Sequence, residues 1–218
     1  MTLVVIMAGG RGQRLHPLTE STPKPMLPVG GKPMVEEVID GFMEQGFSDF
    51  VLTTCYKADL IEGYLGDGSA KGANIKYIRE EEPQGTVGAL RVLRGETPVI
   101  VCNADIQAHI DYKDLIGHHI RHDCEATMCL ALYQIQIPFG VARLVQNQVE
   151  MIDEKPIKNY SVSAGVNVLD PHVFASIPDG KYDMPDLLMS LTTLSAYHIT
   201  GHWADIGTFE AYNGANSR

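Results

Sequence analysis

Short apolar runs alternate with amphipathic segments along the first half of the chain. Leu3 to Met7 and Val99 to Cys102 are continuously apolar, as is typical of strands buried on both faces of a sheet. Lys32 to Gln45 places its apolar residues on one helical face and is followed by Gly46, a common helix-ending residue. Further strands are predicted at Phe50 to Thr54 and Asn74 to Ile78, and further helices at Ala58 to Leu65 and Thr86 to Leu93. This alternation predicts a parallel sheet with helices on both faces and ligands at the carboxyl ends of its strands.

The second half has a different pattern. Asp111 to His122 is predicted to be a helix, and a last helix is predicted to begin near Thr208. Four segments between them are predicted to be strands separated by short turns: Ala126 to Tyr133, Val141 to Val145, Val149 to Ile152, and Ser163 to Leu169. We therefore expect a mixed α/β sheet with antiparallel additions, in one domain without repeats or linkers.

Composition narrows the class of protein. The 218 residues are 44% hydrophobic and carry a formal net charge of −10. Such an acidic chain is a poor candidate for binding nucleic acid or anionic membranes, because both depend on diffuse positive charge. The four cysteines, none in a C-x-x-C pair, are expected to be reduced and mostly buried. Without a signal peptide or a membrane-length apolar stretch, we expect a cytoplasmic location.

A glycine loop directly follows the first strand, with Gly9, Gly10 and Gly12 among its residues. Such loops bring backbone N–H groups close to a phosphate or a base. Leu15 stands where a dinucleotide-binding loop has its third glycine, and no Gly-Lys-Ser/Thr closes a phosphate loop of the ATPase type. The loop instead carries Arg11 and Arg14. Ten residues further on, Lys24 lies among three prolines, which would hold its charge at a fixed point near a triphosphate.

These two segments closely resemble the signature of the sugar-1-phosphate nucleotidylyltransferases. The resemblance rests on Ala8-Gly9-Gly10-x-Gly12-x-Arg14-Leu15 followed by Pro23-Lys24-Pro25-Met26-Leu27-Pro28-Val29, and it extends over nearly the whole chain. It implies a Rossmann-like, three-layer α/β/α fold with a mixed, mostly parallel central sheet. It further implies a single nucleotidyltransferase domain over residues 1–218, with a nucleotide-binding half at 1–110 and a sugar-binding half at 111–218.

The resemblance also assigns roles to residues. It implies a Mg²⁺-dependent transfer from a nucleoside triphosphate to a sugar 1-phosphate, giving a nucleotide sugar and pyrophosphate. Asp105 follows a buried strand, where a carboxylate can hold Mg²⁺ against phosphate oxygens, although an aspartate there can also cap the next helix. The implied catalytic residues are Arg14, Lys24 and Asp105, and the implied metal ligands are Asp105 and Asp205. The implied nucleotide-binding residues are Ala8, Gly9, Gly10, Arg11, Gln84 and Gly85, and the implied sugar-binding residues are Gly140, Glu154, Lys155 and Asn167.

Two departures from the family pattern concern the ligands. Ala104 stands where the family usually has glycine, so an added methyl group would narrow the space at the nucleotide. Asn167 replaces the usual aromatic residue, and Ser163 the usual asparagine, on the sugar side. An unusual acceptor sugar is therefore kept as an alternative.

The amino-acid sequence of the motifs most resembles that of the nucleotidyltransferase domain that follows tandem CBS modules in bacterial surface-sugar enzymes. This resemblance favours GTP as the donor and a role in cell-surface polysaccharide biosynthesis. The segment from Leu188 to Tyr197 is a few residues shorter than in the family. Two further questions are left open: whether a regulatory domain lies upstream, and whether the protein forms a homo-oligomer. The C-terminal β-helix of many relatives is not expected, and neither is a partner nucleic acid or membrane.

Three other functions are weighed against the transferase. A non-catalytic nucleotide-sugar-binding or regulatory homologue is the main alternative, although Arg14, Lys24, Asp105 and Asp205 are all in place. Guanylylation of a molybdopterin acceptor ranks lower because the segments around Glu154 and Asp205 favour a sugar. An NAD-dependent oxidoreductase ranks last because the glycine loop does not fit it.

Overall fold

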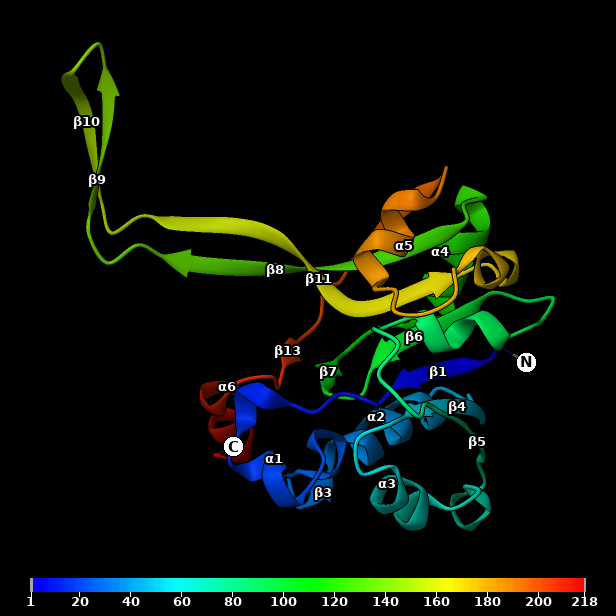
Figure 1. Cartoon of the computed structure of the whole chain (residues 1–218). Helices are drawn as coiled ribbons and strands as arrows, with labels where there is room; N and C mark the ends of the chain where they lie inside the picture. Colours follow the sequence, from blue (N-terminus) through cyan, green and yellow to red (C-terminus); the bar gives the residue numbers. More distant parts are fainter. Residues whose placement is uncertain (1, 218) are drawn as a thin grey trace.

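The computed structural model describes residues 2–217 and is built on a seven-stranded mixed sheet (Figure 1). The strand order is β12-β8-β11-β6-β1-β4-β5. Only β11 runs antiparallel to its neighbours; the other pairings in the sheet are parallel. The strands are β1 (Val4–Met7), β4 (Asp49–Thr54), β5 (Asn74–Arg79), β6 (Val99–Asn103), β8 (Ala126–Gln136), β11 (Ile157–Leu169) and β12 (Leu194–His198).

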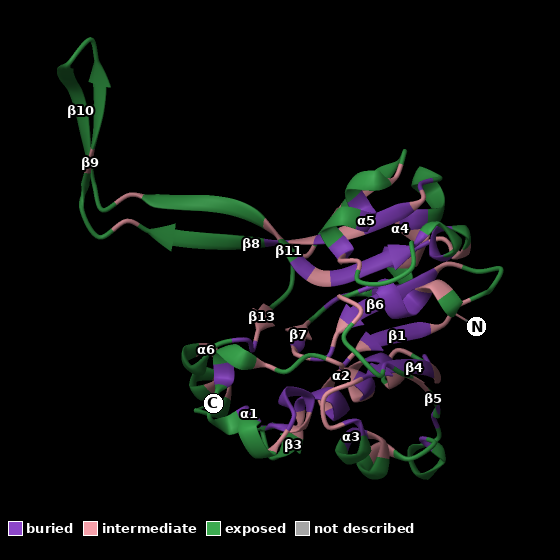
Figure 2. Ribbon diagram, in the orientation of Figure 1, coloured by how far each residue is buried: buried purple, intermediate pink, exposed green. Residues whose placement is uncertain are grey.

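Helices cover both faces of this sheet. The continuously apolar β1 contributes Val4 and Ile6 to one core and Val5 to the other, all three fully buried. On the first face lie α2 (Met34–Met43), α3 (Ala58–Leu65) and α4 (Tyr112–His122). On the second lie α5 (Met184–Ser190) and the 3₁₀ helices η4 (Gly88–Val92) and η5 (Pro171–Ser176). The predicted three-layer α/β/α fold is confirmed, and Figure 2 shows the buried residues concentrated on the central strands.

Strands from both halves of the sequence share the sheet. β6, from the first half, pairs with β11, from the second, through the register Val166–Cys102 to Leu169–Val99. Residues 2–110 and 111–217 therefore have a common core, and the division of the chain into functional halves at 1–110 and 111–218 stays a prediction. Among the described residues, no helix is long and apolar enough to cross a bilayer.

One predicted helix is wrong. Thr86 to Leu93 forms only the short 3₁₀ helix η4, because its first residues are bonded to another segment. The N–H of Thr86 donates to Asp183 Oδ1 at 2.9 Å, and the N–H of Val87 donates to the Tyr182 carbonyl at 3.1 Å. Thr86 Oγ1 in turn accepts from the N–H of Met184 at 2.6 Å. These bonds tie the segment to the start of α5 in place of a regular helical first turn.

Strands β8 and β11 continue well beyond the core as a two-stranded arm, which we define as residues 132–162. β8 ends at Gln136, whereas the sequence predicted an end at Tyr133. β11 begins at Ile157, whereas the sequence predicted a start at Ser163. The predicted strands at 141–145 and 149–152 are confirmed as the hairpin β9 (Gly140–Val145) and β10 (Gln148–Glu154). This hairpin forms the far end of the arm, clear of the body (Figure 1).

Short elements complete the chain. The last helix, α6 (Phe209–Asn216), begins as predicted, with Thr208 accepting from the N–H of Ala211 at its N-terminus. Cys102, Cys124 and Cys129 are buried and Cys55 is half-buried, all as free thiols, which agrees with the sequence. The remaining elements are α1 (Leu18–Ser21), β2 (Pro28–Val29), β3 (Lys32–Pro33), β7 (Ile106–Ala108), β13 (Trp203–Asp205), and the 3₁₀ helices η1 (Gln13–Leu15), η2 (Lys24–Met26) and η3 (Ser69–Lys71).

Candidate active site

A cavity of about 590 Å³ lies at the carboxyl ends of β1, β4 and β6. This is the edge of a parallel sheet where ligands bind in open α/β folds. Its wall includes the glycine loop, Lys24, the segment Asn103–Asp105 and the loop with Gly85. The predicted site residues that line it are Ala8, Gly9, Gly10, Arg11, Arg14, Lys24, Gly85 and Asp105.

Close packing explains two glycines of the loop. A Cβ on Gly9 would lie 2.9 Å from Glu80 Oε2 and 3.3 Å from Cys55 Cβ. Gly12 has a positive φ of 63°, and a Cβ there would lie 2.7 Å from that of Lys24. Only glycine avoids both the strain and the overlap. The loop therefore packs directly against the proline-rich segment that carries Lys24.

Four charged side chains form a chain, and three of them, Arg14, Lys24 and Asp105, line the cavity. The ammonium of Lys24 donates to Asp105 Oδ2 in a short hydrogen bond and lies 4.0 Å from Asp205 Oδ1. Arg14 Nη2 lies 4.0 Å from Asp205 Oδ2. Lys24 is 9% exposed, so its charge is fixed in the wall and does not move freely in solvent. All three residues predicted to be catalytic, together with Asp205, meet here although they come from four separate segments.

Asp205 reaches this group through a two-stranded pairing of β13 with β7 that places it opposite Ile106. The N–H of Ile206 donates to the Asp105 carbonyl at 3.0 Å, which holds the two aspartates side by side. Burial raises the pKa of the Asp205 carboxyl, and the nearby Asp105 raises it further, while Lys24 and Arg14 oppose the rise. Trp203 anchors this strand by donating from Nε1 to the Ala164 carbonyl at 2.9 Å.

The two carboxylates fit the chemistry of a divalent cation. Asp205 Oδ1 is buried and accepts no hydrogen bond from the described part of the chain. Within residues 2–217, no cluster of three or more His, Cys, Asp or Glu could enclose a metal. Mg²⁺ characteristically takes one or two carboxylates and leaves its other positions to water and substrate phosphates. Asp105 and Asp205 suit that mode of binding.

The residues expected near the base are placed mainly by backbone contacts. Gly85 has a φ of 78°, and a Cβ there would lie 2.4 Å from the Tyr182 carbonyl oxygen. The side chain of Gln84 accepts a short hydrogen bond from Arg91. Arg11 is directed toward Tyr56, with its guanidinium 5.6 Å from the ring centre. Ala104, which stands where the family usually has glycine, lies in the cavity wall and is 3% exposed. Its methyl group therefore borders this space.

Sequence reasoning missed Glu80, Lys181 and Asp183, which also line the cavity. Glu80 is 8% exposed, and burial raises the pKa of its carboxyl, although the Gln84 N–H opposes this by donating to Oε1 at 3.2 Å. It directly follows β5, so the signal that found Asp105, an acid at the end of a strand, would have found it too. Lys181 and Asp183 lack such a signal because they come from a loop far away in sequence.

The residues expected to bind the sugar lie elsewhere. Gly140 and Glu154 are exposed on the hairpin β9–β10 and face each other in its register, and Lys155 follows them. Asn167 is instead buried in β11, paired with Val101 and Met128, and its Oδ1 accepts no hydrogen bond from the described residues. None of the four lines the cavity.

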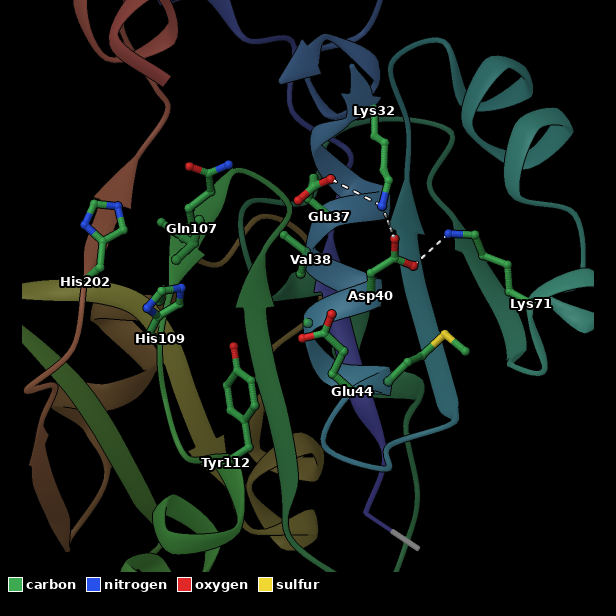
Figure 3. Close-up of a pocket in the computed structure, with 14 residues that line it drawn as sticks. Lys32, Glu37, Val38, Asp40, Glu44, Lys71, Gln107, His109, Tyr112 and His202 are labelled. Carbon is green, nitrogen blue, oxygen red and sulfur yellow. Dashed lines mark hydrogen bonds and ion pairs between the residues drawn. The ribbon is translucent and has the colours of Figure 1, made fainter. Parts of the chain in front are cut away.

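A larger hollow of about 760 Å³ lies between α2 and β7 (Figure 3). Both lysines of its lining are already paired, with Lys32 3.0 Å from Asp40 Oδ2 and Lys71 2.7 Å from Asp40 Oδ1. It contains none of the residues that the sequence assigned to the site. Its size alone does not make it the active site, and we take the cavity at Lys24 as the candidate.

Residues 3–218 match the nucleotidyl transferase family. The chain is 32% identical to a mannose-1-phosphate guanyltransferase of Pichia angusta, covering 93% of this chain and 60% of that protein. It is 30% identical to a mannose-1-phosphate guanylyltransferase of Mycobacterium tuberculosis, covering 95% and 62%. The chain thus spans about 60% of the length of these curated relatives.

Solved structures show the same fold. One is a proposed glucose-1-phosphate thymidylyltransferase from Bacillus anthracis in complex with a sucrose, with a TM-score of 0.79, 25% identity, and coverage of 100% of this chain and 94% of that one. Another is HddC from Yersinia pseudotuberculosis complexed with GMP-PN, with a TM-score of 0.79, 26% identity, and coverage of 100% and 99%. With the family match extending over nearly every residue, the chain belongs to the nucleotidyl transferase family.

Proposed function

We propose that the chain transfers a nucleotidyl group from a nucleoside triphosphate to a sugar 1-phosphate and releases pyrophosphate, with GTP as the favoured donor. The observation that carries this proposal is the cation of Lys24, fixed between Asp105 and Asp205 beside the glycine loop. The guanylyltransferases of Pichia and Mycobacterium and the GMP-PN complex of HddC support a guanine nucleotide as the donor.

The geometry suits a single displacement at the α-phosphorus. A phosphate oxygen of the acceptor attacks, the bond to the β-phosphate breaks, and pyrophosphate leaves, so no nucleophile of the protein is required. Lys24 and Arg14 place positive charge where the phosphates would lie, in a chain of net charge −10. Because Lys24 is buried, it needs little reorganisation as charge develops in the transition state.

Asp105 and Asp205 would hold Mg²⁺, which when bound supplies neutralising charge for the phosphate oxygens. The carboxylates also position Lys24, through the contacts of its ammonium with both. The glycine loop presents backbone instead of side chains to the cavity, which lets a base or ribose approach closely.

The decisive experiment measures pyrophosphate release with Mg²⁺ for four nucleoside triphosphates crossed with a panel of sugar 1-phosphates. The panel holds mannose, glucose, glucosamine, N-acetylglucosamine and N-acetylmuramate 1-phosphates. Turnover that requires both a triphosphate and a sugar 1-phosphate is the expected result, with GTP the best donor. Pyrophosphate release that needs no acceptor would contradict the proposal.

A non-catalytic nucleotide-binding homologue is the second candidate, and one observation favours it. Gly140 on β9 and Glu154 on β10, both expected to bind the sugar, stand apart from the cavity of the same chain (Figure 1). Tight binding of GTP by calorimetry, with no turnover anywhere on the panel, would support this second function.

A further inference from the structure

Two loops that are far apart in the sequence form one wall of the candidate active site. The first loop, residues 83–88, brings Gly85 into the lining of the cavity, and the second, residues 179–184, brings Lys181 and Asp183. We define these two loops together as the base-side wall. The sequence predicted that Gly85 lies near the base, so this wall is where the proposed function would place the nucleoside.

The two loops of the base-side wall are in close contact. The N–H of Tyr182 donates to the Gln84 carbonyl at 2.9 Å. A Cβ built on Gly85 would lie 2.4 Å from the Tyr182 carbonyl oxygen, and one built on Gly88 would lie 2.6 Å from the Gly180 carbonyl oxygen. With the hydrogen bonds of Thr86 described above, these contacts make the position of each loop depend on the other.

One side chain, that of Arg91 on η4, contacts both loops. Its Nη1 donates to the side-chain oxygen of Gln84 in a short hydrogen bond and to the Gly88 carbonyl at 2.7 Å. Its Nε lies 3.3 Å from Asp179 Oδ1, at the start of the second loop. A guanidinium group suits such a bridge, because it presents several donors in one rigid plane, whereas a lysine ammonium does not.

The contacts of Arg91 also lead from the surface to the glycine loop. The N–H of Gln84 donates to Glu80 Oε1 at 3.2 Å, and Glu80 Oε2 would lie 2.9 Å from a Cβ built on Gly9. Burial raises the pKa of the Glu80 carboxyl, and both the Gln84 N–H and the charge of Arg91 oppose this rise. Arg91 itself does not line the cavity. Its removal would therefore loosen the wall without taking a group away from the ligand.

We propose that Arg91 is a positioning residue for the donor nucleotide: it holds the two loops of the base-side wall together and thereby sets the affinity for the nucleoside part. The effect on the donor rests on the proposed function, whereas the effect on the loops does not.

Hydrogen–deuterium exchange tests the effect on the loops without any ligand. The N–H groups of Val87 and Tyr182 donate from one loop to the other. In Arg91→Ala we expect both to exchange about tenfold faster than in the wild type. Arg94→Ala is the matched control, since Arg94 lies just beyond η4 and its Nη1 donates to the carbonyls of Arg91 and Leu93. Unchanged exchange in Arg91→Ala, or the same acceleration in the control, would overturn the proposal.

Calorimetry with two probes tests the effect on the donor. GTP carries a base, a ribose and three phosphates, whereas inorganic triphosphate carries the phosphates alone. Because the base-side wall would meet the nucleoside, we expect Arg91→Ala to weaken the binding of GTP about tenfold and that of inorganic triphosphate less than about twofold. Arg91→Lys keeps the charge but loses the planar group, and it should weaken GTP binding similarly. Equal weakening of both probes would overturn the role of Arg91 at the nucleoside.

Steady-state kinetics separates positioning from a general loss of structure. At saturating sugar 1-phosphate, we expect the KM for GTP to rise about tenfold in Arg91→Ala while kcat changes less than about twofold. The Arg91 side chain is 30% exposed, so added methylguanidinium can occupy its place and should lower the KM again. The same ion should leave Arg94→Ala unchanged. A fall in kcat at unchanged KM would overturn the positioning role.

Failure of the proposed function would be recognised separately. A wild type that binds GTP without transferring it would refute the transfer and leave the calorimetric comparison valid. A wild type that binds no GTP would refute both the donor and the role of Arg91 at the nucleoside. The exchange rates would then still decide whether Arg91 holds the loops together.

Discussion

At the scale of single residues, charge is concentrated in one place. Lys24, Arg14, Asp105 and Asp205 come from four segments, yet successive members of this chain lie within about 4 Å of each other. The electrostatic interaction of Lys24 with the neighbouring carboxylates is strong, because little solvent screens its buried ammonium group.

Lys24→Ala and Asp105→Ala are each expected to lower the turnover by two or more orders of magnitude, about 3 kcal/mol of transition-state stabilisation. Each change breaks a largely buried ion pair, so the melting temperature should fall while the protein stays folded. Stopped-flow pyrophosphate release checks the rate and thermal melting checks the fold. Lys57→Ala is the control, a half-buried lysine that precedes α3 and does not line the cavity. Near-wild-type rates in either cavity variant would remove the catalytic assignment.

Gly85→Ala is expected to destabilise the protein more than Gly72→Ala. Both glycines have a φ of 78°, so the backbone strain of the new alanine is matched. Only Gly85 has a close neighbour, the Tyr182 carbonyl at 2.4 Å from a built Cβ. The overlap should cost about 1–3 kcal/mol beyond the control. Denaturant unfolding of the two variants measures this difference, and equal free energies of unfolding would contradict it.

At the scale of elements, helix α2 is joined to α3 and η3 by a half-buried network. Glu36 on α2 accepts from Tyr64 of α3 at 2.5 Å and pairs with Lys71 of η3 at 2.5 Å. The hydrogen bond from Lys71, followed by that from Tyr64, lowers the pKa of the Glu36 carboxyl below its ordinary 4.5. A lowered pKa means that this stabilisation is present above about pH 4.5 and is lost as the pH falls through the folded-state value.

Glu36→Gln is therefore expected to lower the free energy of unfolding at pH 7 by about 1–3 kcal/mol. The difference from the wild type should shrink as the pH falls below 4.5, because the wild type then loses the same charge. Urea unfolding at a series of pH values measures it. Glu37→Gln, on the same helix and paired more loosely with Lys32 at 3.7 Å, is the control and should have little effect. A pH-independent loss in Glu36→Gln would contradict the assignment.

Most elements could be predicted because their apolar periodicity is local. The central strands, α2, α3 and α4 follow from patterns within ten or so residues. The error at Thr86 to Leu93 had a long-range cause, since Asp183 and Tyr182 form hydrogen bonds with its first residues. Likewise, Lys24, Asp105 and Arg14 were found from local motifs, whereas Lys181 and Asp183 reach the cavity only through the fold. The position of Glu154 depends on where a long ribbon points, which no local pattern encodes.

At the scale of the whole molecule, the body and the arm differ in what holds them together. The body buries two apolar cores on the faces of one sheet, and residues 137–156 contribute to neither. This end of the arm consists of β9, β10 and the short connections at their base.

Replacing residues 137–156 by Asn-Gly is expected to leave the body folded and able to bind GTP. Gln136 lies opposite Ile157, so a two-residue turn can join them without changing the register. Transfer to a sugar 1-phosphate should be lost, because Glu154 and Lys155 are removed. Calorimetry with GTP and pyrophosphate release together check this. Loss of GTP binding in a folded protein, or unchanged transfer, would contradict it.

The separation of the arm from the cavity also has an evolutionary consequence. The residues around the triphosphate site belong mainly to the first part of the gene, while the β9–β10 hairpin is encoded by one short uninterrupted stretch. Under the proposed function, mutation or recombination within that stretch would change what meets the acceptor and leave the donor site intact. Descendants of a chain with that function could then acquire new sugars while inheriting the same nucleotide.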